Sequence, residues 1–163
     1  VRCEETAFDL GKELAMTGEI AAGKLVKWTL ISPAYFPGNG WLPDFCKDTT
    51  KEGAAQKLGT VMLRRTKDGP LIGANLVGAC VGKPVVYSGW DTRTRVKPTQ
   101  LAVPAGSAYL FRCYDADAAR ALIDALHLKP RSQNSGQGFG IGVCSLVDDF
   151  KPYAVHIYQC KGE

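Results

Sequence analysis

The sequence is poor in the residue types that most often build metal and catalytic sites. It has only two histidines, and its six cysteines lie far apart without a CxxC pair. This spacing predicts neither a zinc site nor a dense disulfide framework, so we expect reduced thiols scattered through a core. We expect no metal and no other cofactor.

Long apolar runs are also missing. No stretch approaches the roughly 18 residues that indicate a membrane helix, and the start, VRCEETAF, lacks the basic and apolar segments of a signal peptide. We therefore expect a cytoplasmic protein with no membrane partner. With 45% hydrophobic and 22% charged residues, the 163-residue chain has the composition of a globular protein with one sizeable core or two small ones.

The net charge of +4 is concentrated in one segment. Between Lys83 and Arg112 there are five basic residues and one acidic residue, a difference that equals the whole excess. A basic stripe suits an anionic polymer, since each neutralised phosphate releases counterions. Arg93, Arg95 and Lys97 alternate along SGWDTRTRVKPT, and we interpret them as contacts for either RNA or an acidic subunit face, with a solvated loop as the alternative.

Apolar periodicity predicts most of the secondary structure. Alternation predicts a strand within 24–36, until Pro33 interrupts it, and further strands at 84–89 and 109–114. The segment 71–82, LIGANLVGACVG, is interpreted as a short buried helix of small residues, whose glycines would allow close packing on a sheet. Residues 48–70 are polar and are interpreted as an insertion, with a helix-compatible piece at 54–63.

The second half contains the clearest helix signal. Asp115 is placed to cap a helix, Asp117 lies near its positive end, and an apolar stripe at i, i+3, i+4, i+7 follows. The stripe consists of Ala119, Leu122, Ile123 and Leu126. The helix should end before Pro130, and a strand rich in glycine should follow over 136–147.

The element order is therefore strand, helix, strand, strand, helix, strand. This order predicts an α+β, ferredoxin-like (RRM-like) domain over residues 24–147, with the polar insertion at about 48–70. Because the chain opens on Val, residues 1–23 are interpreted as an N-terminal segment left from an upstream domain. Residues 148–163 are interpreted as a C-terminal tail.

Glycine occupies every second position from Gly136 to Gly142. A segment with so little side chain should have a phosphate chain or another backbone close against it. Exposed amides there would form an anion-binding nest. The RNA-binding candidates are Ser135, Gly136, Gln137, Gly138, Phe139 and Gly140, the upstream Lys129 and Arg131, and the turn Pro104, Ala105 and Gly106.

Each of these candidates has a structural alternative. The glycines would also let a helix and a sheet approach each other, Phe139 would also suit a core, and the turn at 104–106 would also serve the fold alone. Trp41 and Trp90 are candidate partner-interface anchors, since Trp is enriched at hot spots, and they suit a domain core equally well.

We expect no catalytic residue. His127 lies at a helix end, where a capping role explains it, and His156 lies in the tail. Neither belongs to a nucleophile signature, and GQGFG precedes a strand instead of opening a helix, so the dinucleotide fingerprint fails.

Three motifs together resemble one protein family. They are SGWD at 88–91, AVPAGSAYLF at 102–111 and GFGIG at 138–142. In identity and order they are similar to the C-terminal half of the third-subunit family of the type III-B (Cmr) CRISPR RNA-targeting complex, within the RAMP superfamily. The segment 31–45, ISPAYFPGNGWLPDF, resembles the start of that half.

The resemblance implies a non-catalytic assembly subunit of a type III effector ribonucleoprotein for antiviral defence. Such a subunit helps hold the 5′ tag of the guide (CRISPR) RNA, against the large polymerase-like subunit and a backbone RAMP subunit. The alternative is a protein-interaction module of the complex without direct RNA contact.

Overall fold

The core of the molecule is a six-stranded sheet in the order β10-β1-β9-β4-β3-β2. A computed structural model describes residues 25–48, 58–91, 95–96 and 99–147. All neighbouring strands of the sheet run antiparallel. The strands are β1 (Leu25–Leu30), β2 (Cys46–Asp48), β3 (Gly59–Val61), β4 (Ala74–Cys80), β9 (Ala108–Cys113) and β10 (Gly142–Val147).

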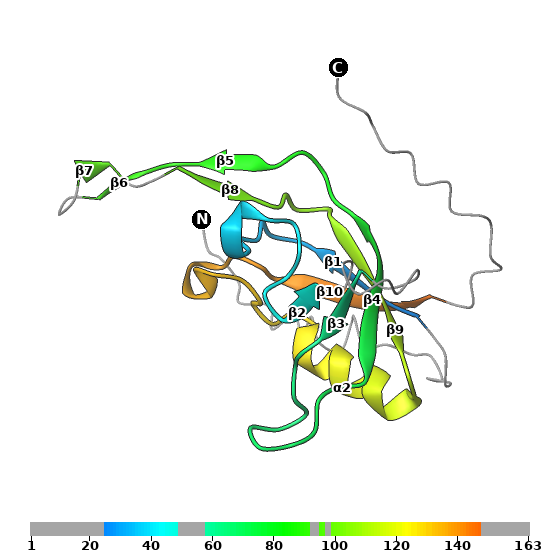
Figure 1. Cartoon of the computed structure of the whole chain (residues 1–163). Coiled ribbons are helices and arrows are strands. Elements are labelled where there is room, and N and C mark those ends of the chain that lie inside the picture. Colours follow the sequence, from blue (N-terminus) through cyan, green and yellow to red (C-terminus); the bar gives the residue numbers. More distant parts are fainter. Residues whose placement is uncertain (1–24, 49–57, 92–94, 97–98, 148–163) are drawn as a thin grey trace, which may run out of the picture.

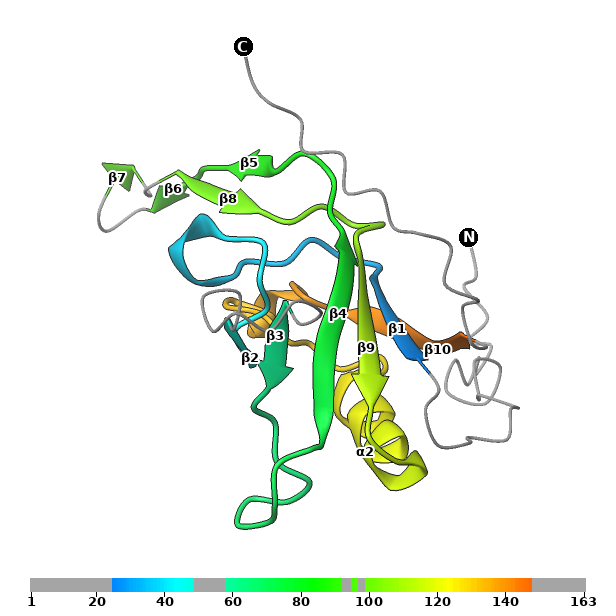
Figure 2. The ribbon, with the colours of Figure 1, turned by 45° about the vertical axis from the view of Figure 1, so that its right-hand side comes forward.

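Strands β1 and β9 bury mainly one face each, as their alternation predicts. On β1 the indole of Trp28 is fully buried and lies opposite Tyr109 of β9 and Cys144 of β10. Successive side chains on a strand point to opposite faces, so the alternating positions of β9 and β10 face the same side as Trp28. The helix α2 (Ala116–Leu126) covers this face in both views (Figures 1 and 2).

The helix begins and ends as the sequence indicates. The Asp115 carboxylate accepts a hydrogen bond from the Ala118 amide at 2.6 Å, which caps the first turn. Leu122 and Leu126 are fully buried in the core. His127 caps the C-terminus, and its Nδ1 accepts a hydrogen bond from the Cys144 amide at 3.1 Å.

A long hairpin-like arm extends from the β4–β9 end of the sheet (Figures 1 and 2). We define the arm as four short strands that form two successive antiparallel pairs, β5 with β8 and β6 with β7. They are β5 (Val85–Tyr87), β6 (Trp90–Asp91), β7 (Arg95–Val96) and β8 (Gln100–Ala102). The strand predicted at 84–89 is therefore confirmed, but it lies in the arm and not in the main sheet.

The helix predicted at 71–82 is wrong, because this segment forms β4. Its small residues suit either structure, and pairing with β9 decides the matter. The two glycines also have other roles than helix packing. An added Cβ at Gly73 would lie 2.8 Å from the Tyr114 ring, and Gly78 lies at a shift in the β4–β9 register.

The glycine-rich strand is much shorter than predicted, since β10 begins only at Gly142. Residues Ser135–Gln137 form a 3-10 turn, η3. Gly138 and Gly140 have left-handed φ values of 83° and 74°, which no β-strand adopts. We call residues 134–141 the glycine-rich loop.

The α+β architecture and the antiparallel sheet are compatible with the predicted ferredoxin-like fold. The part of the chain that the structure describes contains one α-helix, and it crosses from β9 to β10. Within the predicted insertion, 59–61 form β3 and belong to the main sheet. The predicted N-terminal segment and C-terminal tail lie outside the described residues. No helix among those described is long and apolar enough to cross a bilayer.

Candidate nucleic-acid interface

Three aromatic rings meet where the arm approaches the glycine-rich loop. We call Tyr35, Tyr87 and Phe139 the aromatic cluster. The ring centroids of Tyr35 and Phe139 are 4.6 Å apart, and Tyr87 stands nearly perpendicular to Phe139 at 5.6 Å. Aromatic pairs in these geometries attract each other beyond their buried area. The cluster thus links the arm to the loop.

The backbone of Tyr35 is fixed to the chain just before the loop. Its amide donates to the Ser132 hydroxyl at 2.7 Å, and its carbonyl accepts from the Gln133 amide at 3.1 Å. The Tyr35 side chain is buried, and burial together with Tyr87 raises the pKa of its phenol. The ring is therefore a neutral support for the cluster at physiological pH.

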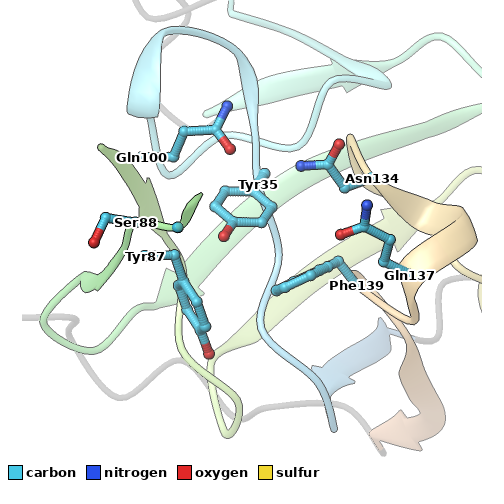
Figure 3. A pocket seen from close by; sticks show the side chains of 8 residues that line it. Tyr35, Tyr87, Ser88, Gln100, Asn134, Gln137 and Phe139 are labelled. Atoms are coloured by element: carbon cyan, nitrogen blue, oxygen red, sulfur yellow. The ribbon is translucent and has the colours of Figure 1, made fainter. Parts of the chain in front are cut away.

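A pocket of about 390 Å³ lies beside the aromatic cluster. Figure 3 shows its lining, with Gln100 from β8 and the side chains of Asn134 and Gln137 from the loop around the rings. None of the described residues that line it is charged; they are Tyr35, Tyr87, Ser88, Gly89, Gln100, Asn134, Gln137 and Phe139.

The glycines of the loop serve different purposes. Gly136 and Gly138 are exposed, and an added Cβ at either position would meet no atom within 4 Å. Gly140 and Gly142 are buried, and an added Cβ would lie 2.3 Å from the Ser132 Cβ and 2.2 Å from the Trp28 Nε1. Only the first two therefore leave bare backbone toward solvent.

Four of the eight loop amides already have acceptors. Gln137 and Gly138 donate to carbonyls within the turn, Gly140 donates to the Pro33 carbonyl at 2.8 Å, and Ile141 donates to the Ser32 hydroxyl at 2.9 Å. The consecutive amides of Asn134, Ser135 and Gly136 have no acceptor among the described residues, so the anion nest is limited to this short row.

The two cations upstream of the loop lie against the helix end. The Lys129 ammonium donates to the Asp124 carbonyl, and the Arg131 Nε donates to the Ala125 carbonyl at 2.9 Å. Cations at a helix C-terminus compensate the negative end of its dipole. Both residues stabilise α2 in this structure, and their contact with RNA stays a prediction.

The turn at 104–106 is tied to β1. Gly106 has a left-handed φ of 86°, and its amide donates to the Leu30 carbonyl at 2.7 Å. The Ser107 amide donates to the Pro104 carbonyl at 3.3 Å. These bonds favour the structural interpretation of this turn, although Ala105 itself is exposed.

Of the basic stripe, the structure describes only part. Arg93 and Lys97 lie outside the described residues, and of Arg95 only the backbone is described, in β7. Trp90 is likewise described by its backbone in β6. Trp41 has an exposed fraction of 40%, and its carbonyl accepts from the Tyr109 hydroxyl at 2.7 Å. Its role as an interface anchor stays a prediction.

The thiols behave as core residues. Burial raises the pKa of three of them to about 12, which keeps them protonated; they are Cys46, Cys113 and Cys144. Cys80 is exposed and free. Within the described ranges, no group of three or more His, Cys, Asp or Glu side chains is arranged to hold a metal ion.

Sequence reasoning missed six of the eight described residues that line the pocket. Phe139 and Gln137 are among the candidates. Ser88 and Gly89 are not, and neither are the larger residues Tyr35, Tyr87, Gln100 and Asn134. These four come from three separate segments, so no local spacing connects them. The usable signal is their position in the sequence: Tyr87 directly precedes the motif SGWD, and Tyr35 lies within ISPAYF.

Comparison with known proteins shows the class to which this chain belongs. A model of the family described as CRISPR-associated protein (Cas_Cmr3) matches residues 4–145, most of the chain. The chain therefore belongs to the Cas_Cmr3 family, and with it to the subunits of the type III-B Cmr CRISPR complex. The predicted family is confirmed. No curated protein and no solved structure matches the chain.

Proposed function

We propose that the chain is a non-catalytic, cytoplasmic subunit that helps bind the 5′ tag of the guide RNA. In this proposal it also contacts the large polymerase-like subunit and the backbone RAMP subunit of the effector complex. The observation that carries the proposal is the junction of the arm, which bears the basic stripe, with the exposed glycine-rich loop. Family membership makes the chain a subunit of the Cmr complex, and the proposal places the guide RNA at this junction.

A phosphate chain and this junction have matching chemistry. The sequence puts Arg93, Arg95 and Lys97 on the outer part of the arm, while Gly136 and Gly138 leave the loop surface low and open. Lys and Arg supply the salt-dependent share of RNA affinity, and a loop without large side chains lets a strand approach closely.

The potential nucleophiles and bases support a non-catalytic role. The Nδ1 atom of His127 accepts a hydrogen bond from the Cys144 amide, so this nitrogen carries no proton and holds β10 to α2. The buried thiols have raised pKa values, as described above. These groups serve packing and capping, and none of them faces the pocket.

Salt dependence tests the RNA contact. The complex is reconstituted with the wild-type chain or with the double variant Arg93→Ala/Arg95→Ala, and guide affinity is measured over a range of salt concentrations. Losing two phosphate contacts should weaken binding of unrelated guides alike and should lower the slope of log affinity against log salt by about 1.4. Arg64→Ala is the matched control, because Arg64 is exposed and precedes β4 at the end away from the arm.

A wild-type slope that the double variant leaves unchanged would favour the interaction module without RNA contact. Catalysis is tested separately by incubating the complex with labelled RNA and a divalent metal ion. Cleavage that His127→Ala abolishes would contradict the non-catalytic assignment.

A further inference from the structure

The pocket beside the aromatic cluster suits a neutral planar ring better than a phosphate. Its volume of about 390 Å³ lies within the range of roughly 300–1,000 Å³ typical of small-ligand sites. Phosphate recognition relies mainly on Lys and Arg, and the described residues of the lining include no charged side chain. The ligand is therefore recognised by shape, stacking and neutral hydrogen bonds.

Two of the rings offer stacking surfaces. Tyr35 is only 5% exposed and supports the base of the cluster, whereas Tyr87 and Phe139 are half-buried and line the open side. Figure 3 shows the three rings side by side, with Phe139 below Tyr35 and Tyr87 beside them. Aromatic rings that keep part of their surface accessible are the platforms on which unstacked bases lie in RNA-binding proteins.

Three side-chain amides complete the lining. Gln100 lies directly opposite Tyr87 across the β5–β8 pair, so both side chains are on one face of the arm. Asn134 has a left-handed φ of 59°, which Asn tolerates better than most residues. In the part of the chain that the structure describes, the side chains of Gln100, Asn134 and Gln137 make no hydrogen bond.

An amide side chain offers a donor and an acceptor next to each other, as does the edge of every nucleobase. The loop and the arm thus present the two recognition elements together, a stacking surface and unused amides. A purely structural aromatic cluster would need the rings but not the amides.

We infer that this pocket accepts one unstacked nucleobase. The inference rests on the proposed function and deepens it: cationic residues of the arm hold the phosphate chain, and the pocket fixes the position of the strand by taking one base. Phosphate contacts position a nucleic acid, whereas base contacts specify it.

An abasic scan of the guide tests the inference. Each nucleotide of the 5′ tag is replaced in turn by an abasic one, and affinity for the reconstituted complex is measured. We expect a loss of about 5- to 150-fold at one position, the range that one stacked base contributes. Phe139→Leu should remove the difference between complete and abasic guides at that position, and the loss should be equal at low and high salt.

Two further variants keep the test independent of folding. Gln137 is exposed and makes no side-chain hydrogen bond, so Gln137→Ala leaves the fold intact and should reduce discrimination between bases at the same position. Val86→Ala is the matched control, because Val86 has an exposed fraction of 62% on the opposite face of the arm from Tyr87. It should bind every guide as the wild type does.

Equilibrium dialysis of the RNA-free complex with each of the four labelled nucleosides identifies the source of the base. Nucleoside binding that Phe139→Leu abolishes, without an effect in the abasic scan, assigns the pocket to a free nucleoside. A flat scan together with no nucleoside binding overturns the inference. A third outcome separates the two hypotheses. If a complex assembled without this chain binds the guide with unchanged affinity, and the complete complex still binds nucleosides, the proposed function fails and the inferred base pocket is retained.

Discussion

Substituting Gly142 by alanine tests how tightly β10 packs on the core. An added Cβ would lie 2.2 Å from Nε1 and 2.7 Å from Cε2 of the Trp28 indole, and 2.9 Å from the Thr29 carbonyl oxygen. The indole has little room to move, because it is fully buried and its centroid lies 5.7 Å from that of Phe45 and 5.6 Å from that of Tyr109.

The expected magnitude follows from two opposing effects. Overpacking a core costs about 1–3 kcal/mol, and the lower entropy of the unfolded Ala chain returns about 0.4–1 kcal/mol. Contacts this short belong at the upper end of the cost, so we expect Gly142→Ala to lower the free energy of unfolding by about 2 kcal/mol. Urea unfolding followed by tryptophan fluorescence and circular dichroism measures it.

The neighbouring glycines supply matched controls. At Gly136 an added Cβ would contact no atom and φ is not left-handed, so Gly136→Ala should leave the free energy of unfolding equal or slightly higher. At Gly138 the Cβ would also contact no atom, but the φ of 83° should make Gly138→Ala less stable by about 1–2 kcal/mol. Gly140→Ala combines a φ of 74° with a Cβ 2.3 Å from that of Ser132 and should cost most. Equal stability of Gly142→Ala and Gly136→Ala would refute the reasoning.

Three further results are expected. Native alkylation at pH 8, mapped by peptide mass spectrometry, should label Cys80 quickly and the buried thiols slowly; fast labelling of Cys113 would contradict their burial. Because the folded-state pKa of these thiols is raised to about 12, their contribution to stability should be complete below about pH 8.5 and decline as the pH rises toward 12, as unfolding curves at increasing pH will show. Asp115→Ala should cost about 1 kcal/mol by removing the acceptor for the Ala118 amide, whereas Asp115→Asn should keep most of the stability; equal losses in thermal unfolding would point to charge instead of capping.

Local sequence patterns predict those elements whose apolar periodicity is clear within their own residues. The alternation over 108–113 and the stripe of α2 are such cases, because burial on one face follows from period alone. The segment that became β4 is ambiguous locally, and only its pairing with β9 distinguishes strand from helix. The glycines at 138 and 140 have the spacing of a strand, yet both have positive φ values; Gly138 ends the 3-10 turn, and Gly140 is bonded to Pro33 and Arg131 elsewhere in the chain.

The candidate site was predictable only in part for the same reason. Phe139 and Gln137 stood out because the glycine run drew attention to them. Their partners Tyr35 and Tyr87 come from the segment after β1 and from the arm. Only the tertiary structure brings these rings together.

The direct pairing of Tyr87 with Gln100 divides the arm into two parts with different tolerance to length. Toward the sheet, inserting one residue into either strand would turn the side chain of that strand away from the aromatic cluster, since orientation along a strand reverses at every residue. Beyond the pair, and beyond Ser88 and Gly89 of the pocket lining, a change in length does not alter which way the two side chains point. An affinity peptide or a fluorescent label introduced there would leave the sheet register intact.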